Sequence, residues 1–137
     1  MTNEEKKEYL NEYKLACKKV VALQEQLESL REVEQSAKVQ KLSDMPKGSG
    51  SRQSDLSDLM IRIEELQEEV DTALDKCIEK KLEIEESLIC RVDDEEARVL
   101  RYRYIKLLGW KEIAKRLDYS VRHVQRIHGR AIENYDI

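Results

Sequence analysis

The stretch WKEIAKRLDYSVRHVQRIHGRA, residues 110–131, decides how the last part of the chain folds. It predicts a short helix over residues 110–117, a tight turn, and a last helix that reaches about Tyr135. Ser120 precedes that last helix, where a hydroxyl group can accept from free backbone N–H groups and so cap the helix. Six apolar side chains recur at helical spacing and are expected to face inward: Ile113, Ala114, Leu117, Val124, Ile127 and Ala131.

The start of the last helix carries mainly polar and basic side chains on its outward face: Val121, Arg122, Gln125, Arg126 and Arg130, with His123 beside them. A short helix, a tight turn and a capped helix with exposed Arg and Gln form the layout of a helix-turn-helix, whose second helix enters the major groove of DNA. Arginine can pair with guanine and glutamine with adenine. Gly129 costs this helix about 1 kcal/mol relative to alanine, which suggests close approach to a neighbour or to the DNA backbone. The sequence thus predicts a helix that reads double-stranded DNA.

Charge is divided unevenly along the chain. The whole chain has a formal charge of −4, but residues 97–131 contain ten basic and two acidic residues. Residues 1–90, in contrast, contain 14 basic and 21 acidic residues. A strongly basic segment in an acidic protein favours a polyanionic partner, which agrees with the predicted DNA-reading helix.

Residues 93–109 predict a further helix before this motif. Two aspartates at its start can serve as the N-cap, and Gly109 is expected to end it. Its inward side chains are expected to be Val99, Leu100, Tyr102, Tyr104 and Leu107 or Leu108.

The first two thirds of the chain predict two long helices. Residues 4–39 contain no glycine or proline, and apolar or small residues recur there every three or four positions. The same spacing returns over residues 55–90, interrupted at Lys80. Such patterns are typical of coiled-coil-like helices. The connecting segment SDMPKGSGSRQSD, residues 43–55, contains the only proline and is expected to be a flexible surface loop.

The two long helices fit one antiparallel register. The facing residues are expected to be Leu30 with Ile63, Leu27 with Leu66, Leu23 with Val70, Val20 with Ala73, Ala16 with Cys77, and Tyr9 with Ile84. The residue numbers of every pair add up to 93, so a single helical hairpin satisfies all layers. The same faces could equally pair between chains, as a dimeric coiled coil or a four-helix assembly.

Composition excludes several classes of protein. Charged residues make up 39% of the chain and aromatic residues 5%, which favours amphipathic helices over sheet. No apolar run approaches the ~20 residues that span a bilayer, and three widely spaced cysteines, expected to be small buried residues, fit a reducing cytosol. His123 and His128 have no further metal ligand beside them, and no nucleophile or acid–base pair has supporting context. We therefore expect no metal, cofactor, membrane span or catalytic residue.

The segments EEARVLRYRYI (95–105) and WKEIAKRLDYSVRHVQRIHGRAI (110–132) resemble region 4 of the sigma-70 family over about 45 residues. The family pattern has an acidic start and V-L-x-x-R-Y, followed by residues that are matched here by Glu112, Ile113, Ala114, Leu117, Ser120, Val124, Arg130 and Ala131. The charged hairpin, its SDMPKGSG connector and the RIHGRAI ending make the whole chain similar to small phage and prophage regulators of the RinA and ArpU type.

The sigma-type resemblance implies base contacts by Val121, Arg122 and Arg126, and DNA-backbone contacts by Lys111, His123 and Arg130. From their places in the motif, Gln125 joins the base contacts and Ser120 the backbone contacts. Val121 departs from the long polar residue that is common at its position, and it could meet a thymine methyl group instead. The chain has no recognisable counterpart of the sigma segment that reads the −10 element and binds the polymerase core.

Together these observations predict an all-α protein. Residues 1–90 are expected to form a long antiparallel helical hairpin with a loop at 43–55, and residues 91–137 a sigma-region-4-like helix-turn-helix domain. The expected function is sequence-specific regulation of transcription, encoded by a phage or prophage, without enzymatic activity. Expected partners are double-stranded DNA, RNA polymerase and a second copy bound through the hairpin. Two alternatives are a packaging component similar to a small terminase subunit, and a helical scaffold whose basic surface binds an acidic protein.

Overall fold

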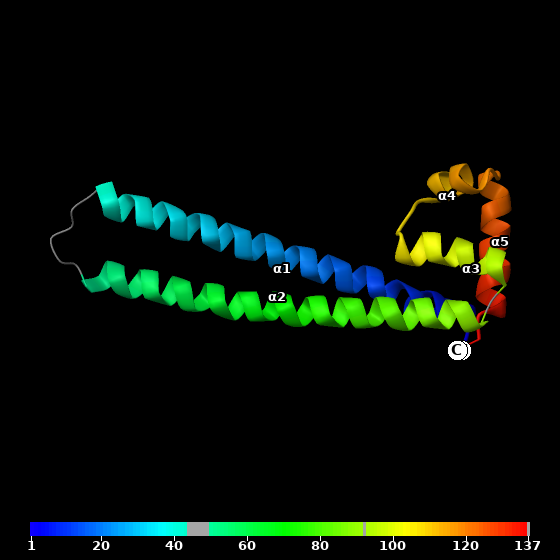
Figure 1. The fold of residues 1–137 in the computed structure, drawn as a ribbon, viewed down its shortest axis with the longest axis horizontal. Coiled ribbons are helices and arrows are strands. Elements are labelled where there is room, and N and C mark those ends of the chain that lie inside the picture. The colour runs from blue at the N-terminus through cyan, green and yellow to red at the C-terminus, as the bar shows by residue number, and fades with distance from the viewer. Residues whose placement is uncertain (44–49, 92, 137) are drawn as a thin grey trace. The chain divides into compact units, whose positions relative to one another are not determined.

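The computed structural model describes the backbone of residues 1–43, 50–91 and 93–136, and the side chains of 1–39, 55–90 and 93–136. Its elements are α1 (Asn3–Ser43), α2 (Gly50–Arg91), α3 (Asp94–Leu100), the π-helix η1 (Arg101–Ile105), α4 (Trp110–Leu117) and α5 (Val121–Asn134), labelled in Figure 1. The described residues contain no strand, which confirms the all-α class. None of their helices contains a stretch long and apolar enough to cross a membrane.

The two long helices extend further than their patterns predict. Within the loop expected at 43–55, residues 44–49 lie outside the described residues. Ser43 and residues 50–55 are helical, because α1 ends at Ser43 and α2 begins at Gly50.

The chain forms two compact units. One, which we call the hairpin unit, comprises Lys18–Asp75, and the other, the terminal unit, comprises Met1–Cys17 together with Lys76–Ile137. The division expected after residue 90 therefore does not coincide with a boundary between compact units. The first turns of α1 and the last turns of α2 belong to the same unit as α3, α4 and α5.

In the hairpin unit, α1 and α2 pack in the expected antiparallel register. Leu27, Leu66 and Val70 form a buried cluster, against which Leu23, Leu30 and Ile63 pack. These are the residues of three predicted layers. Arg31 donates from Nη2 to Gln67 Oε1 at 2.9 Å beside this cluster.

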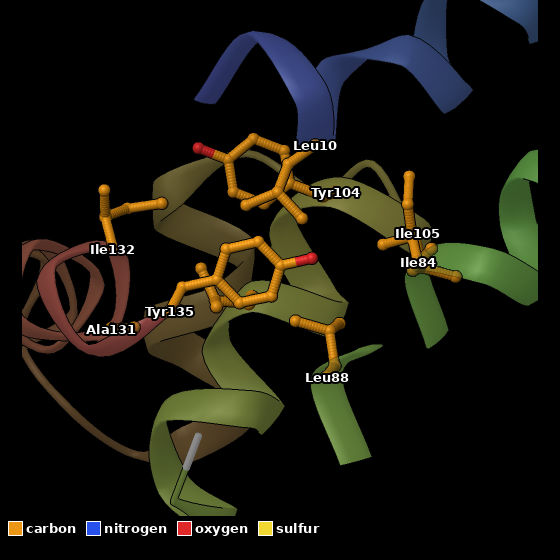
Figure 2. Close-up of a cluster of buried hydrophobic side chains, with 9 residues drawn as sticks. Leu10, Ile84, Leu88, Tyr104, Ile105, Ala131, Ile132 and Tyr135 are labelled. Atoms are coloured by element: carbon orange, nitrogen blue, oxygen red, sulfur yellow. The ribbon is translucent and has the colours of Figure 1, made fainter. Parts of the chain in front are cut away.

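The core of the terminal unit joins residues from both ends of the sequence. It contains Leu10 of α1, Ile84 and Leu88 of α2, Leu100, Tyr104 and Ile105 of α3 and η1, and Ala131, Ile132 and Tyr135 in or after α5. Figure 2 shows Leu10, Tyr104 and Tyr135 pointing toward one another. The free energy gained by burying an apolar side chain grows with the surface removed from water, so the fully buried Leu10 and Tyr135 contribute strongly to the stability of this core.

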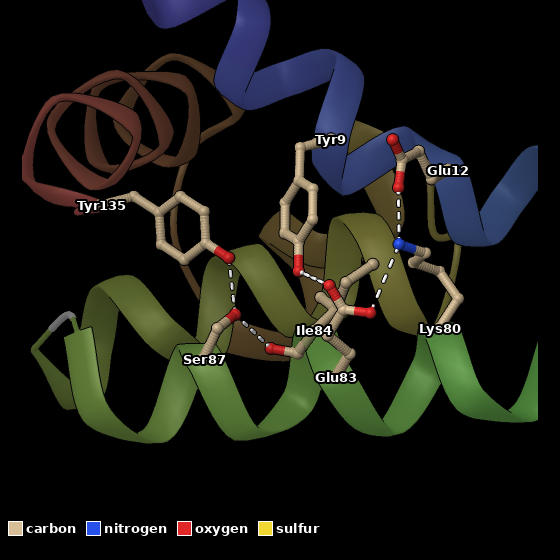
Figure 3. A network of polar contacts seen from close by, with 7 residues as sticks. All are labelled: Tyr9, Glu12, Lys80, Glu83, Ile84, Ser87 and Tyr135. Atoms are coloured by element: carbon tan, nitrogen blue, oxygen red, sulfur yellow. Dashed lines mark hydrogen bonds and ion pairs between the residues drawn. The ribbon is translucent and has the colours of Figure 1, made fainter. Parts of the chain in front are cut away.

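Lys80, which interrupts the apolar pattern of α2, has a set of polar partners in the terminal unit (Figure 3). Its Nζ lies 2.7 Å from Glu12 Oε2 and 3.4 Å from Glu83 Oε2, and 5.1 Å from the centre of the Tyr9 ring. The hydrogen bond with Glu12 is the largest cause that raises the pKa of Lys80. Tyr9 donates to Glu83, and this bond lowers the pKa of the Glu83 carboxyl group. Such a polar layer favours one register of the two helices, because any shift between them would separate the charged side chains from their partners.

The end of η1 differs from the expectation that Gly109 terminates this helix. Lys106 N donates to Arg101 O, and Leu108 N donates to Tyr102 O, both at 2.9 Å, so the chain already turns at these residues. Leu107 takes the left-handed conformation at the turn, with φ of 57°. Gly109 has an extended backbone and occupies the N-cap position of α4 instead. The expected helix stop is therefore wrong by a few residues.

Candidate nucleic-acid interface

The helix-turn-helix predicted at 110–135 is formed by α4 and α5 on a core of their own. Val99, Ile113, Ala114, Val124 and Ile127 are buried in this core, and Tyr102, Leu108, Trp110, Leu117 and Val121 pack against it. The predicted inward faces of both helices are thereby confirmed. Since α3 supplies Val99, the same core fixes both helices to the preceding one.

The turn between the two helices is defined by backbone hydrogen bonds. Tyr119 N donates to Ala114 O at 2.9 Å, and Asp118 takes the left-handed conformation with φ of 58°. This pattern closes the end of α4 without a glycine. Ser120 then caps α5 as predicted, because its Oγ accepts from His123 N at 3.1 Å.

Removing this cap should weaken the domain without changing its core. We expect Ser120→Ala to lower the free energy of unfolding by about 1 kcal/mol, because one backbone N–H of α5 loses its acceptor. Ser120→Asp keeps a capping oxygen and should retain most of the stability. Urea unfolding followed by the fluorescence of Trp110, the only tryptophan, measures both variants. Equal losses in the two variants would contradict a capping role.

Three of the four residues predicted to contact bases share one exposed face of α5. Arg122, Gln125 and Arg126 are exposed, and their spacing of three and four residues places them side by side. No ion pair in the described part of the chain involves Arg122 or Arg126. Val121 differs from them, because it is half-buried and packs on the core below.

The four residues predicted to contact the DNA backbone lie at the start of α4, at the cap of α5 and on α5 itself. Lys111 at the start of α4 and Arg130 on α5 are exposed. Ser120 uses its oxygen to cap the helix, which leaves its hydroxyl hydrogen available to an outside acceptor. His123 is half-buried and stands edge-on to Tyr119, with ring centres 4.6 Å apart.

Two of the ten basic residues counted from sequence form contacts within the domain. Arg103 donates to Leu108 O at 3.2 Å and stacks over the Trp110 ring at 4.2 Å. Arg116 pairs with Glu112 at 3.2 Å. The exposed basic side chains of this segment are Arg98, Lys106, Lys111, Lys115, Arg116, Arg122, Arg126 and Arg130. Their number still gives the surface a clear excess of positive charge.

Gly129 has open space around it. A Cβ atom built on it would meet no atom of the described residues within 4 Å, so the expected close approach to a neighbouring element is not found. We expect Gly129→Ala to raise the free energy of unfolding by about 0.5–1 kcal/mol, because alanine loses less backbone entropy in a helix. Thermal unfolding by circular dichroism measures this gain. A loss of stability would mean that the position needs the freedom of glycine.

His128, considered from sequence only as a metal ligand, is buried in the structure. Its Nε2 lies 2.8 Å from the Tyr104 hydroxyl, and its ring meets the Trp110 ring edge-on at 4.9 Å between centres. Burial, with smaller contributions from Lys7 and Arg103, lowers the pKa of His128 to about 4. The imidazole is therefore neutral at physiological pH. Burial likewise raises the pKa of Tyr104 to about 12, so its hydroxyl can donate to His128.

This neutral histidine makes stability depend on pH. In the unfolded chain His128 takes up a proton below pH about 6.5, whereas in the folded protein it does so only near pH 4. The stability of the fold that depends on a neutral His128 is therefore fully present above the unfolded pKa of about 6.5, and it is lost as the pH falls toward 4. We expect the free energy of unfolding to fall by about 1–2 kcal/mol more in the wild type than in His128→Gln between pH 7 and pH 5. Urea titrations at both pH values test this, and parallel losses would contradict it.

The C-terminal end of α5 is fixed by three other helices of the terminal unit. Lys6 of α1 donates from Nζ to Ile132 O at 3.1 Å and to Glu133 O at 3.2 Å, where a positive charge suits the helix dipole. The Asn134 amide donates to both carboxylate oxygens of buried Glu96 in α3, at 3.1 and 3.2 Å. Because Ser87 of α2 donates to Ile84 O, it can accept from the Tyr135 hydroxyl, as drawn in Figure 3.

These contacts leave opposite ends of α5 in different environments. Its first turns present Arg122, Gln125 and Arg126 to solvent, while its last turn is held by α1, α2 and α3. No group of three or more possible metal ligands occurs within the described residues. The arrangement is suited to recognition of a polyanion by exposed side chains on a rigid helix.

A comparison with known families agrees with this geometry. Residues 88–134 match the family model described as "Sigma-70, region 4", which spans the end of α2 and all of α3, η1, α4 and α5. Neither the curated proteins nor the solved structures compared with the chain gave a significant match. The family match supports a DNA-binding helix-turn-helix in the C-terminal part of this chain.

Proposed function

We propose that the protein is a site-specific DNA-binding regulator of transcription that acts at promoters. The observation that carries this proposal is the exposed face of Arg122, Gln125 and Arg126 at the capped start of α5. The second helix of a helix-turn-helix enters the major groove with its N-terminal residues toward the bases. The similarity of residues 88–134 to sigma-70 region 4 supports the same orientation.

Each predicted contact residue has a defined role in this proposal. Arg122 and Arg126 pair with guanine, and Gln125 pairs with adenine. Val121, half-buried at the edge of the core, offers only part of its side chain, which fits contact with a thymine methyl group. The phosphates are bound by Lys111, Ser120, His123 and Arg130.

A single short motif offers few base contacts, so the proposal includes a source of additional affinity. Either two copies joined through the acidic hairpin bind adjacent half-sites, or RNA polymerase holds the protein at the promoter. The resemblance of the whole chain to RinA and ArpU type regulators favours control of phage or prophage genes in the cytoplasm of a bacterial host. These partners and this origin belong to the proposal.

The test is binding of the purified full chain to DNA fragments from its own genomic neighbourhood. We expect one fragment to be shifted in a mobility assay in the presence of excess competitor DNA, and the affinity to fall steeply with salt concentration. A fragment upstream of a transcription unit would support regulation, and one within a packaging site would support a packaging component instead. Absence of any shift at low salt, with and without RNA polymerase, would overturn the proposal.

A further inference from the structure

Two cysteines face each other across the hairpin helices in the terminal unit. Cys17 of α1 and Cys77 of α2 are separated by 60 positions in sequence, and their sulfur atoms lie 3.4 Å apart. Both are free thiols. Cys77 is buried, with 7% of its surface exposed, and Cys17 is half-buried. The third cysteine, Cys90, is exposed, contrary to the expectation that all three are buried.

We propose that Cys17 and Cys77 form a reversible intrachain disulfide when the protein meets a peroxide. A disulfide joins two sulfur atoms at about 2.05 Å, so the two thiols need to approach by little more than 1 Å. Side-chain rotation with a small adjustment of the two helices can supply such a movement. The pair is fixed within one unit, which makes this bond favoured over a link to another molecule.

The environments of the two thiols suggest the order of the reaction. Cys17 is the more accessible sulfur, and the hydrogen bond of its side chain with Tyr13 raises the pKa of Tyr13 to about 12. For Cys77, burial and the neighbouring Cys17 raise the thiol pKa to about 11, while Lys81 acts in the opposite direction. Cys17 is therefore the first nucleophile and Cys77 the resolving thiol.

The atoms balance with hydrogen peroxide as the oxidant. The Cys17 thiolate attacks one peroxide oxygen, the O–O bond breaks, and a sulfenic acid and hydroxide are formed. The Cys77 sulfur then attacks the Cys17 sulfur, the S–O bond breaks, and the departing hydroxyl group leaves as water with the Cys77 proton. Overall, two thiols and one peroxide give one disulfide and two waters.

The bond would tie α1 to α2 close to the core that holds the end of α5. Tyr13, next to Cys17, also packs against that core. A cross-link between distant positions restricts the unfolded chain more strongly than the folded one. Oxidation should therefore stabilise the terminal unit, and a thiol reductant should reverse the effect.

The experiment uses the full chain with Cys90→Ser, which removes the exposed thiol and its intermolecular reactions. After treatment with hydrogen peroxide, we expect a monomer whose mass has decreased by two hydrogen atoms, and a proteolytic fragment that joins the Cys17 and Cys77 peptides. The melting temperature should rise by several degrees and return to its starting value with dithiothreitol. The matched variants Cys17→Ser and Cys77→Ser, each combined with Cys90→Ser, should show neither change.

Two results would overturn the proposal. One is a treated Cys90→Ser protein that keeps both thiols or gains oxygen atoms on one sulfur without a linked peptide. The other is a linked protein whose melting temperature falls, because the bond would then strain the packing. Peptide mapping of Cys90→Ser requires no substitution in the packed layer, so the test holds even if the matched variants fold poorly. None of these measurements involves DNA, so they are independent of the proposed function.

Discussion

Replacing Leu10 with alanine is expected to lower the free energy of unfolding by about 2–5 kcal/mol. Leu10 lies in α1, 100 residues before the start of the helix-turn-helix at Trp110, but it is fully buried among Leu100, Tyr104 and Tyr135. The substitution removes most of a leucine side chain from a packed core and leaves a cavity there. Urea unfolding followed by Trp110 fluorescence measures the loss, because Trp110 packs against the core of α4 and α5.

Leu15→Ala is the matched control for this prediction. The same residue type stands on the same helix and in the same unit, but 61% of its surface is exposed. We expect this variant to differ from the wild type by less than about 0.5 kcal/mol. If both variants shift the Trp110 transition equally, α1 does not share a core with the helix-turn-helix.

The second large effect concerns DNA affinity and rests on the proposed function. We expect Arg126→Ala to weaken binding to the preferred site by about 1–3 kcal/mol, which is roughly a 5-fold to 150-fold loss, and to relax the preference at one base pair. The reason is the loss of the paired hydrogen bonds from arginine to guanine. Competition titrations with a set of sites that differ at single positions measure both the loss and the relaxed preference.

Lys111→Ala separates base recognition from charge. A phosphate contact carries no sequence information, so this variant should weaken binding to all sites alike and lower the slope of log affinity against log salt by about 1. Lys111 and Arg126 are both exposed, and neither forms an ion pair among the described residues. If the two variants behave identically, the recognition face is wrongly assigned.

Local signals predicted the helix-turn-helix well. Ser120 specified where α5 begins, because a capping hydroxyl needs only the next three residues to act. The inward faces of α4 and α5 followed from the helical spacing of their apolar residues, and the structure buries Ile113, Val124 and Ile127 as expected. The antiparallel register of the hairpin unit was equally accessible, since both of its helices carry the same repeat.

The contacts that join distant segments were not predictable in this way. Leu10 lies outside the three-and-four spacing that begins at Tyr9 and Tyr13, and no repeat relates it to its partners Ala131, Ile132 and Tyr135. Buried His128 and Glu96 depend on partners 24 and 38 residues away, and helix periodicity does not connect such positions. The π-helical turn of η1 could not be predicted from the side-chain pattern either, because the hydrogen bonds that close it are made by backbone groups.

The bonds between Lys6 and the end of α5 have a consequence for synthesis of the protein. They join positions 126 and 127 residues apart, and α1 leaves the ribosome long before α5. The hairpin unit is built from segments that are close in sequence, so it can form early in synthesis. Leu10 and Ile84, in contrast, can be buried only after the residues at the end of α5 have been synthesised. Translation that stalls before α5 would therefore release a chain with an uncovered apolar end. Such a product is expected to be a target for chaperones and proteases.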